Sequence, residues 1–140
     1  MKVSAGILII LNNKKILFCH PSNAKWDSML GPPKGGVNIS EDLIDAAIRE
    51  TKEEISVIID KNMIKSSPIE INYSSRNGIL YKKVYLYRVD ISSISEIGMT
   101  SEIIDKNLLQ AEEIDWAGFL TKSEASSKIF FRFRELLDLI

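Results

Sequence analysis

Apolar positions along the chain follow two spacings, which indicates that the fold contains both strands and helices. Short apolar runs predict β-strands over residues 3–11, 16–20, 57–59, 69–73, 79–89 and 113–120. The dipeptide Asn77-Gly78 separates two of these runs and predicts a hairpin turn. Helical spacing instead predicts one helix over residues 40–55 and a second after residue 121. Strands mixed with one central and one terminal helix indicate an α/β sandwich.

Capping residues and turn residues set the expected limits of these elements. Asn38 with Glu41, and Thr121 with Glu124, resemble capping boxes at the starts of the two helices. The C-terminal helix is expected to bury its apolar positions Ile129, Phe130, Phe133, Leu136, Leu137 and Ile140. Residues 21–36 are expected to form a long loop, which in a compact domain indicates function. Residues 90–110 are polar and are expected to be loop with at most a short helical piece.

Composition and charge narrow the class of protein. The 140 residues, 45% hydrophobic and 26% charged, fit a single domain over residues 1–140. A net charge of −1 provides no basic field for nucleic acid. The single cysteine, Cys19, and the single histidine, His20, exclude an intrachain disulfide and a site built from several cysteines or histidines. The apolar stretch 3–11 is too short to cross a bilayer and lacks a cleavage site, so we expect a cytoplasmic protein without a membrane segment.

Three glutamates form the strongest candidate site. Glu50, Glu53 and Glu54 stand at i, i+3 and i+4 of the central helix, where Cβ atoms lie about 5–6 Å apart. Three like charges this close repel one another unless a cation neutralises them. Carboxylate oxygens are ligands that Mg²⁺ accepts while keeping positions open for phosphate, and Mn²⁺ is a possible substitute. A solvated acidic helix is the plain alternative for the three glutamates alone.

The surrounding residues favour the metal site. Residues 35–57 resemble the Nudix box, G-x5-E-x7-R-E-U-x-E-E-x-G-U with U aliphatic, at Gly35, Glu41, Arg49, Glu50, Glu53 and Glu54. The preceding segment from Trp26 to Gly36, with Pro32-Pro33-Lys34-Gly35-Gly36, is similar to the approach to this box in the family. Thr51 and Ser56 depart from the box, where an aliphatic residue and a glycine are usual. We expect the Thr51 hydroxyl to bond a carbonyl one turn back and Ser56 to be strained if φ is positive there.

The resemblance implies a fold and a set of roles. The fold is the Nudix-type α/β/α sandwich with a mixed sheet, a central box helix and a C-terminal helix. Metal ligands are the Gly35 carbonyl and the carboxylates of Glu50, Glu53 and Glu54. The implied catalytic set is Glu50, Arg49 and Glu53, with Glu50 binding metal, acting as general base, or both. Arg49 pairs with a glutamate of the box, Glu41 or Glu50, and Glu41 gives structural support.

Residues outside the box bear on the substrate. Lys34 offers a positive charge for phosphate, and Lys82, Lys83 and Arg76 on the predicted hairpin offer others. Tyr73 lies sixteen residues beyond the box, where diadenosine-polyphosphate hydrolases of the family carry a tyrosine, and its ring can stack on a base. Half-buried packing in a strand is the plain alternative for Tyr73. A further carboxylate ligand is open among Glu96, Glu102, Glu112 and Glu113.

The implied activity is Mg²⁺-dependent hydrolysis of a phosphoanhydride in a nucleoside diphosphate linked to another group. The position of Tyr73 favours dinucleoside polyphosphates, whereas Pro68 lies too early for the ADP-ribose subfamily. A nucleoside-triphosphate pyrophosphatase is the alternative enzyme, and the neutral chain offers little support for capped RNA. A nucleotide sensor that does not cleave its ligand is a third possibility. Such sensors lose box carboxylates, and this chain keeps all of them.

Overall fold

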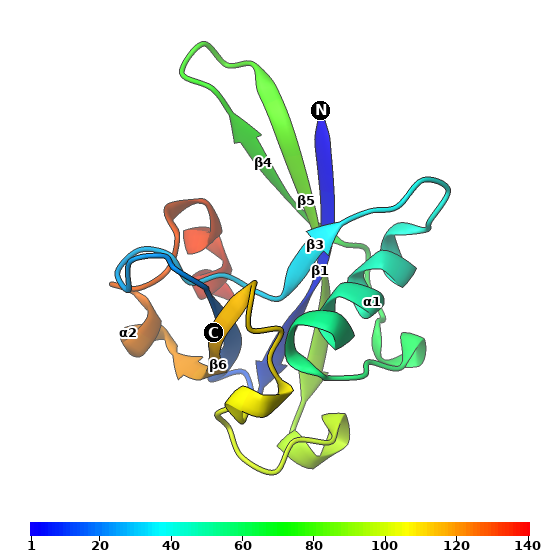
Figure 1. Ribbon diagram of the computed structural model, residues 1–140, viewed down its shortest axis with the longest axis vertical. Helices are drawn as coiled ribbons and strands as arrows, with labels where there is room; N and C mark the ends of the chain where they lie inside the picture. Colours follow the sequence, from blue (N-terminus) through cyan, green and yellow to red (C-terminus); the bar gives the residue numbers. More distant parts are fainter.

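A mixed six-stranded sheet forms the centre of the protein. The computed structural model describes residues 1–140 (Figure 1). The strands are β1 Lys2–Leu11, β2 Lys15–Pro21, β3 Lys34–Gly36, β4 Ile69–Ser74, β5 Leu80–Ile91 and β6 Ile114–Thr121. Their order is β4-β5-β1-β2-β6, and the short β3 also pairs with β1. Strands β1 and β5 run parallel while the other pairs are antiparallel, so the expected α/β fold with a mixed sheet is confirmed.

Strand β1 is apolar because both of its faces are covered. Ala5, Ile7 and Ile9 pack in the cluster that contains helix α1, Leu43–Ile55. Leu8 and Ile10 pack on the opposite face, in the cluster that contains the C-terminal segments. Alternate residues of a strand point to opposite faces, so a strand buried on both faces is a continuous apolar run. Figure 1 shows α1 and the C-terminal segments on either side of the sheet.

Helix α1 begins later than the sequence predicted. Its N-cap is Asp42, whose side chain makes no capping hydrogen bond. Ser40 has a φ of 64°, which is left-handed and stops the helix from extending back to residue 40. Glu41 accepts a hydrogen bond from the Asn38 N–H at 3.0 Å, as in half of a capping box. This bond closes a turn before the helix, and the expected capping box at the helix start is wrong.

Two assignments between these elements also change. Residues 57–59, expected as a strand, form none, although Val57 and Ile59 are buried and Ile58 is exposed. No strand lies beside them to accept their backbone hydrogen bonds, so burial alternates without a sheet. Residues 34–36, expected as loop, instead form β3 against residues 4–6 of β1. A Cβ at Gly6 would overlap the Pro33 carbonyl, so Gly6 permits this close approach.

The hairpin and the loops follow the sequence more closely. Strands β4 and β5 are antiparallel, and Gly78, with a φ of 77°, donates its N–H to the Ser75 carbonyl at 2.9 Å. The turn at Asn77-Gly78 is therefore confirmed. The expected loop at residues 90–110 contains two short 3-10 helices, η2 Ile94–Ile97 and η3 Lys106–Leu108. A third, η1 Lys61–Met63, lies between α1 and β4.

The C-terminal region is divided, not one helix. Thr121 and Glu124 form the expected capping box of α2, Lys122–Ala125. After α2 the chain is no longer helical, because its backbone bonds to the backbone of Leu30. The Leu30 N–H donates to the Lys128 carbonyl and the Leu30 carbonyl accepts from the Phe130 N–H, both at 2.9 Å. The remainder is the 3-10 helix η4, Phe131–Leu139. Ile129, Phe133, Leu136 and Leu137 are buried as expected, whereas Phe130 and Ile140 are only half-buried and the single helix is wrong. No helix of the protein combines the length and apolar character needed to cross a bilayer.

Candidate active site

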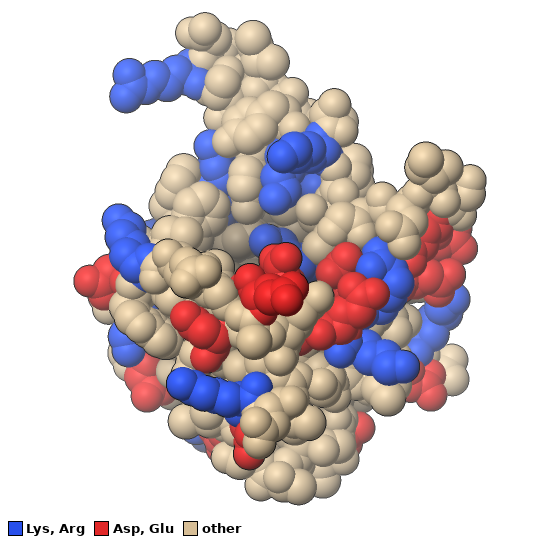
Figure 2. Space-filling model, in the orientation of Figure 1, with Lys and Arg blue, Asp and Glu red and all other residues tan.

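A cleft of about 490 Å³ lies where β2 and β3 separate along one side of β1. Strand β1 pairs with β3 near its start, at residues 4–6, and with β2 near its end, at residues 10–11. One wall of the cleft carries Glu50, Glu53 and Glu54 of α1, and the other carries Lys34, Tyr73 and Phe133. Figure 2 shows acidic side chains gathered at the centre of this face, with basic side chains above them. The sheet therefore brings an acidic wall and a basic, aromatic wall together.

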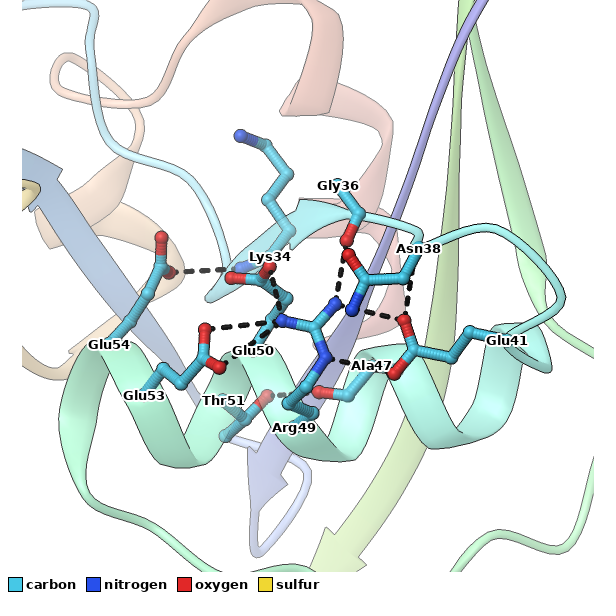
Figure 3. A network of polar contacts seen from close by, with 10 residues as sticks. All are labelled: Lys34, Gly36, Asn38, Glu41, Ala47, Arg49, Glu50, Thr51, Glu53 and Glu54. Carbon is cyan, nitrogen blue, oxygen red and sulfur yellow. Dashed lines mark hydrogen bonds and ion pairs between the residues drawn. The ribbon is translucent and has the colours of Figure 1, made fainter.

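Arg49 holds the acidic wall in place (Figure 3). Its Nε and Nη2 donate to the two Glu41 oxygens at 2.8 and 2.9 Å, which is a bidentate pair. Its Nη1 lies 2.9 Å from Glu50 Oε1 and 3.2 Å from Glu53 Oε2. Nη2 also donates to the Gly36 carbonyl at 2.8 Å. The expected pairing of Arg49 is confirmed with both Glu41 and Glu50, and one guanidinium links β3 to three glutamates.

Arg49 changes the pKa of Glu41 strongly. The Arg49 hydrogen bonds, helped by the Asn38 N–H, lower the pKa of Glu41 to about 2. The carboxylate is therefore ionised at all physiological pH values. Its expected role as structural support agrees with this geometry.

Glu54 is the buried member of the acidic wall. It is 9% exposed, and one carboxylate oxygen accepts the Lys34 N–H at 3.1 Å. Burial, opposed by that hydrogen bond, raises the pKa of Glu54 to about 7. A buried carboxylate is costly to ionise unless a positive charge reaches it. A dication in the cleft would supply that charge.

The residues present fit a divalent metal ion. All three glutamates line one cleft with Gly35, and they provide the hard oxygen donors that Mg²⁺ and Mn²⁺ prefer. A Cβ at Gly35 would overlap the Glu50 carboxylate, so glycine leaves room for that carboxylate beside the backbone. As they stand, no three acidic, histidine or cysteine side chains converge closely enough to hold an ion. Glu50 and Glu53 form ion pairs with Arg49 instead, and their side chains would have to turn toward the metal to bind it.

The structure separates the basic residues predicted to bind substrate. The Lys34 Nζ lies 5.7 Å from the Phe133 ring, and Lys34 lines the cleft. The Lys82 Nζ lies 5.1 Å from the Tyr73 ring, but Lys82 lines a neighbouring depression and not the cleft itself. Lys83 is on the opposite face of β5 and pairs with Glu70 at 3.0 Å. Lys83 does not line the cleft, and its contact with substrate stays a prediction. Arg76, on the hairpin turn, does not line the cleft either.

The structure also narrows the candidates for an extra carboxylate. Glu113 lines the cleft, and its charge contributes to the raised pKa of Glu54. Glu96 instead caps η2, and Glu102 pairs with Lys15 at 2.7 Å. Glu112 is exposed and does not line the cleft. Glu113 is the only one of the four that reaches the acidic wall.

Aromatic residues of the cleft include two that sequence reasoning assigned only to the core. Phe130 and Phe133 line the cleft beside Tyr73, with ring centroids 6.1 and 6.3 Å from the tyrosine. Tyr73 itself is 8% exposed, and burial raises its pKa to about 12. The spacing of the aromatic residues indicates that they are buried, but it does not tell whether they face the core or the cleft. Only the tertiary structure decides between the two.

The two departures from the box have clear structural roles. Thr51 is buried and its hydroxyl donates to the Ala47 carbonyl at 2.8 Å, as expected. Ser56 ends α1 with a φ of 59°, so the positive φ at which a serine is strained is present here. Its hydroxyl donates to the Leu108 carbonyl, a bond that glycine cannot make. Ser56 thereby ties the end of the box helix to the loop that leads to Glu113.

Fold, cleft and box together define a hydrolase that acts on phosphoanhydrides. The family model for the NUDIX domain matches residues 1–133, and the chain belongs to the Nudix family. It is a Nudix-type pyrophosphohydrolase, and members of this family typically use a divalent metal ion. No curated protein sequence is significantly similar to it.

Solved structures give the same fold. A C. elegans Ap4A hydrolase in a binary complex is 26% identical, with a TM-score of 0.65 over 99% of this chain and 92% of that one. A MutT Nudix hydrolase from Burkholderia pseudomallei is 17% identical, with a TM-score of 0.71 over 99% and 97%. A bifunctional NMN adenylyltransferase/ADP ribose pyrophosphatase from Francisella tularensis, complexed with AMP and a Mn ion, is 16% identical, with a TM-score of 0.64 over 97% and 40%.

Proposed function

We propose that the protein hydrolyses a phosphoanhydride in a nucleoside diphosphate linked to another group, with Mg²⁺, and prefers dinucleoside polyphosphates. The observation that carries this proposal is a cleft with carboxylates on one wall and Lys34 with aromatic rings on the other. Such a cleft matches the parts of the substrate, because phosphates need cations and a base needs a planar apolar partner.

In this proposal Glu50, Glu53 and Glu54 hold the metal, with the Gly35 carbonyl. The metal, when bound, would withdraw charge from phosphate oxygens and lower the pKa of a water molecule. Glu50 is the proposed general base, and Arg49 orients Glu50 and Glu53 through the bonds shown in Figure 3. Glu113 is the proposed additional carboxylate.

The basic and aromatic wall binds the remainder of the substrate. Lys34 and Lys82 place positive charge beside the cleft without an acidic side chain paired to either. Phe130 offers a ring for stacking on a base, and Tyr73 lies beside it but is 8% exposed, so Tyr73 mainly supports that ring. The resemblance to an Ap4A hydrolase supports a dinucleoside polyphosphate, as does the position of Tyr73. The cytoplasmic location expected from the sequence stays a prediction.

A panel of phosphoanhydrides with product identification tests the substrate. Diadenosine tetraphosphate, ADP-ribose and nucleoside triphosphates are incubated with Mg²⁺ or Mn²⁺, and the products are separated. Asymmetric cleavage of diadenosine tetraphosphate into two nucleotides is expected. Release of pyrophosphate from a triphosphate, with diadenosine tetraphosphate ignored, would identify the alternative pyrophosphatase.

A matched pair of variants tests the catalytic wall. Glu53→Gln is expected to abolish most Mg²⁺-dependent turnover. Glu70→Gln is the control, because each glutamate side chain is 46% exposed and pairs with one basic residue. Nucleotide binding that is unchanged in Glu53→Gln, with no turnover of any compound by the wild type, would instead identify a sensor.

A further inference from the structure

An aromatic and cationic patch lies outside the cleft, next to Tyr73. We call the outer platform the three residues Tyr81, Phe131 and Arg132. The Arg132 guanidinium lies 4.8 Å from the Phe131 ring centroid and 5.8 Å from that of Tyr81. It also lies 4.7 Å from the Tyr73 ring. Tyr73, which lines the cleft, is therefore also in contact with the platform.

Hydrogen bonds hold the cation of the platform in place, and the rings of the platform are open to solvent. Arg132 Nη2 donates to the Ser74 carbonyl and to the Tyr81 hydroxyl, both at 3.3 Å, which fixes the guanidinium between the hairpin and η4. Phe131 is 63% exposed and Tyr81 is 46% exposed. Exposed rings with a planar cation between them form a stacking surface.

The charge of the platform is not neutralised by the protein. Arg132 makes no ion pair, whereas Arg49 and Arg88 both bind carboxylates. The Lys82 Nζ lies 5.1 Å from the centroid of the Tyr73 ring. A shallow depression is lined by Tyr73, Tyr81, Lys82 and Lys2. Burial and the charges of Lys34 and Lys2 lower the pKa of Lys82, so these lysines share one electrostatic environment. A polyanion leaving the cleft past Tyr73 would meet uncompensated positive charge before it meets the platform.

We propose that the outer platform binds the base of the second nucleotide of a dinucleoside polyphosphate, whose phosphate bridge passes Lys82. This inference rests on the proposed function and deepens it, because it makes the distal base a specificity element. Phe131 and Tyr81 supply the flat surfaces, and Arg132 supplies both a stacking plane and positive charge. A nucleotide with one base and an equally long phosphate chain would use the cleft and leave the platform empty.

Two substrates with four phosphates test the platform. Diadenosine tetraphosphate carries two bases, and adenosine tetraphosphate carries one. Phe131→Ala is expected to raise the KM for the dinucleoside at least about fivefold, as the loss of a base–aromatic stack predicts. The KM for adenosine tetraphosphate and the kcat for both should stay unchanged. Phe131→Tyr, which keeps an aromatic ring, should restore the KM of the wild type.

Ile103→Ala is the control, because Ile103 is 56% exposed and contacts no part of the platform. An equal change in KM for both substrates, or no change for either, would overturn the platform while leaving the proposed hydrolysis intact. Calorimetric binding of a diadenosine tetraphosphate analogue with methylene bridges gives a readout that does not need turnover. Weaker binding by Phe131→Ala supports the platform, and equal binding, or none by the wild type, overturns it.

Discussion

The Glu50 carboxylate lies against the backbone of Gly35, where any Cβ would overlap it. Gly35 adopts no positive φ, so its requirement is space and not backbone freedom. Gly35→Ala is therefore expected to fold but to displace Glu50. A displacement of about 1 Å at a catalytic group costs on the order of 100-fold in rate. We expect kcat for phosphoanhydride hydrolysis to fall by about that factor.

The adjacent glycine supplies the control for this experiment. A Cβ at Gly36 meets nothing within 4 Å, so Gly36→Ala is expected to keep kcat close to that of the wild type. Steady-state kinetics and thermal unfolding of both variants check the result. Equal activity in the two variants would show that the position of Glu50 is unimportant.

Arg49→Lys keeps the positive charge but removes the planar fork. A lysine ammonium cannot reproduce the bidentate pair with Glu41 while also bonding Glu50 and Glu53. We expect kcat to fall at least about tenfold and the free energy of unfolding to fall by about 2 kcal/mol, since several charge-assisted hydrogen bonds are lost. Arg88→Lys is the control, because Arg88 binds only the exposed Asp90. A similar effect of both substitutions on kcat would contradict the role of Arg49.

Glu54 makes the stability of the metal-free protein depend on pH. Its pKa rises from an ordinary 4.5 to about 7 on folding, because burial disfavours the charged carboxylate. The resulting cost is absent below pH 4.5, grows as pH rises and is complete above pH 7. In EDTA the contribution of Glu54 should therefore lower the free energy of unfolding between about pH 5 and pH 8. Mg²⁺ bound to the ionised carboxylate, as proposed, should offset this loss.

Glu54→Gln isolates that contribution, because its amide oxygen can still accept the Lys34 N–H. In EDTA at about pH 8 the variant should be more stable than the wild type, by on the order of 2 kcal/mol. It should lose this advantage near pH 5, and Mg²⁺ should no longer raise its melting temperature. Parallel pH profiles of the variant and the wild type, from denaturant unfolding, would refute the buried charge as the cause.

Ser56 carries two opposing contributions, and two substitutions separate them. Ser56→Ala keeps the strain of a side chain at a φ of 59° and loses the hydrogen bond to Leu108, so it should cost about 1 kcal/mol. Ser56→Gly loses the same bond but relieves about 1 kcal/mol of strain, so its stability should remain near that of the wild type. Chemical denaturation measures both, and a glycine variant less stable than the alanine variant would rule out the strain.

Prediction from sequence succeeded where neighbours along the chain decide the outcome. The turn at Asn77-Gly78 and the capping box of Thr121 with Glu124 are local, and both are confirmed. It failed where distant segments compete for the same backbone. The Leu30 backbone divides the expected C-terminal helix, and residues 57–59 find no strand to join. Local propensity reveals neither the pairing of Leu30 with the C-terminal segment nor the lack of a strand beside residues 57–59.

The sequence by itself determined the acidic wall, because helical periodicity places Glu50, Glu53 and Glu54 on one side of α1 and needs only local hydrogen bonds. Tertiary structure decided what faces that wall. The register of β5 turns Lys82 toward Tyr73 and Lys83 away, and chain packing brings Phe133 and Glu113 to the cleft. These outcomes depend on contacts between residues far apart in the chain, whose free energies no single segment contains.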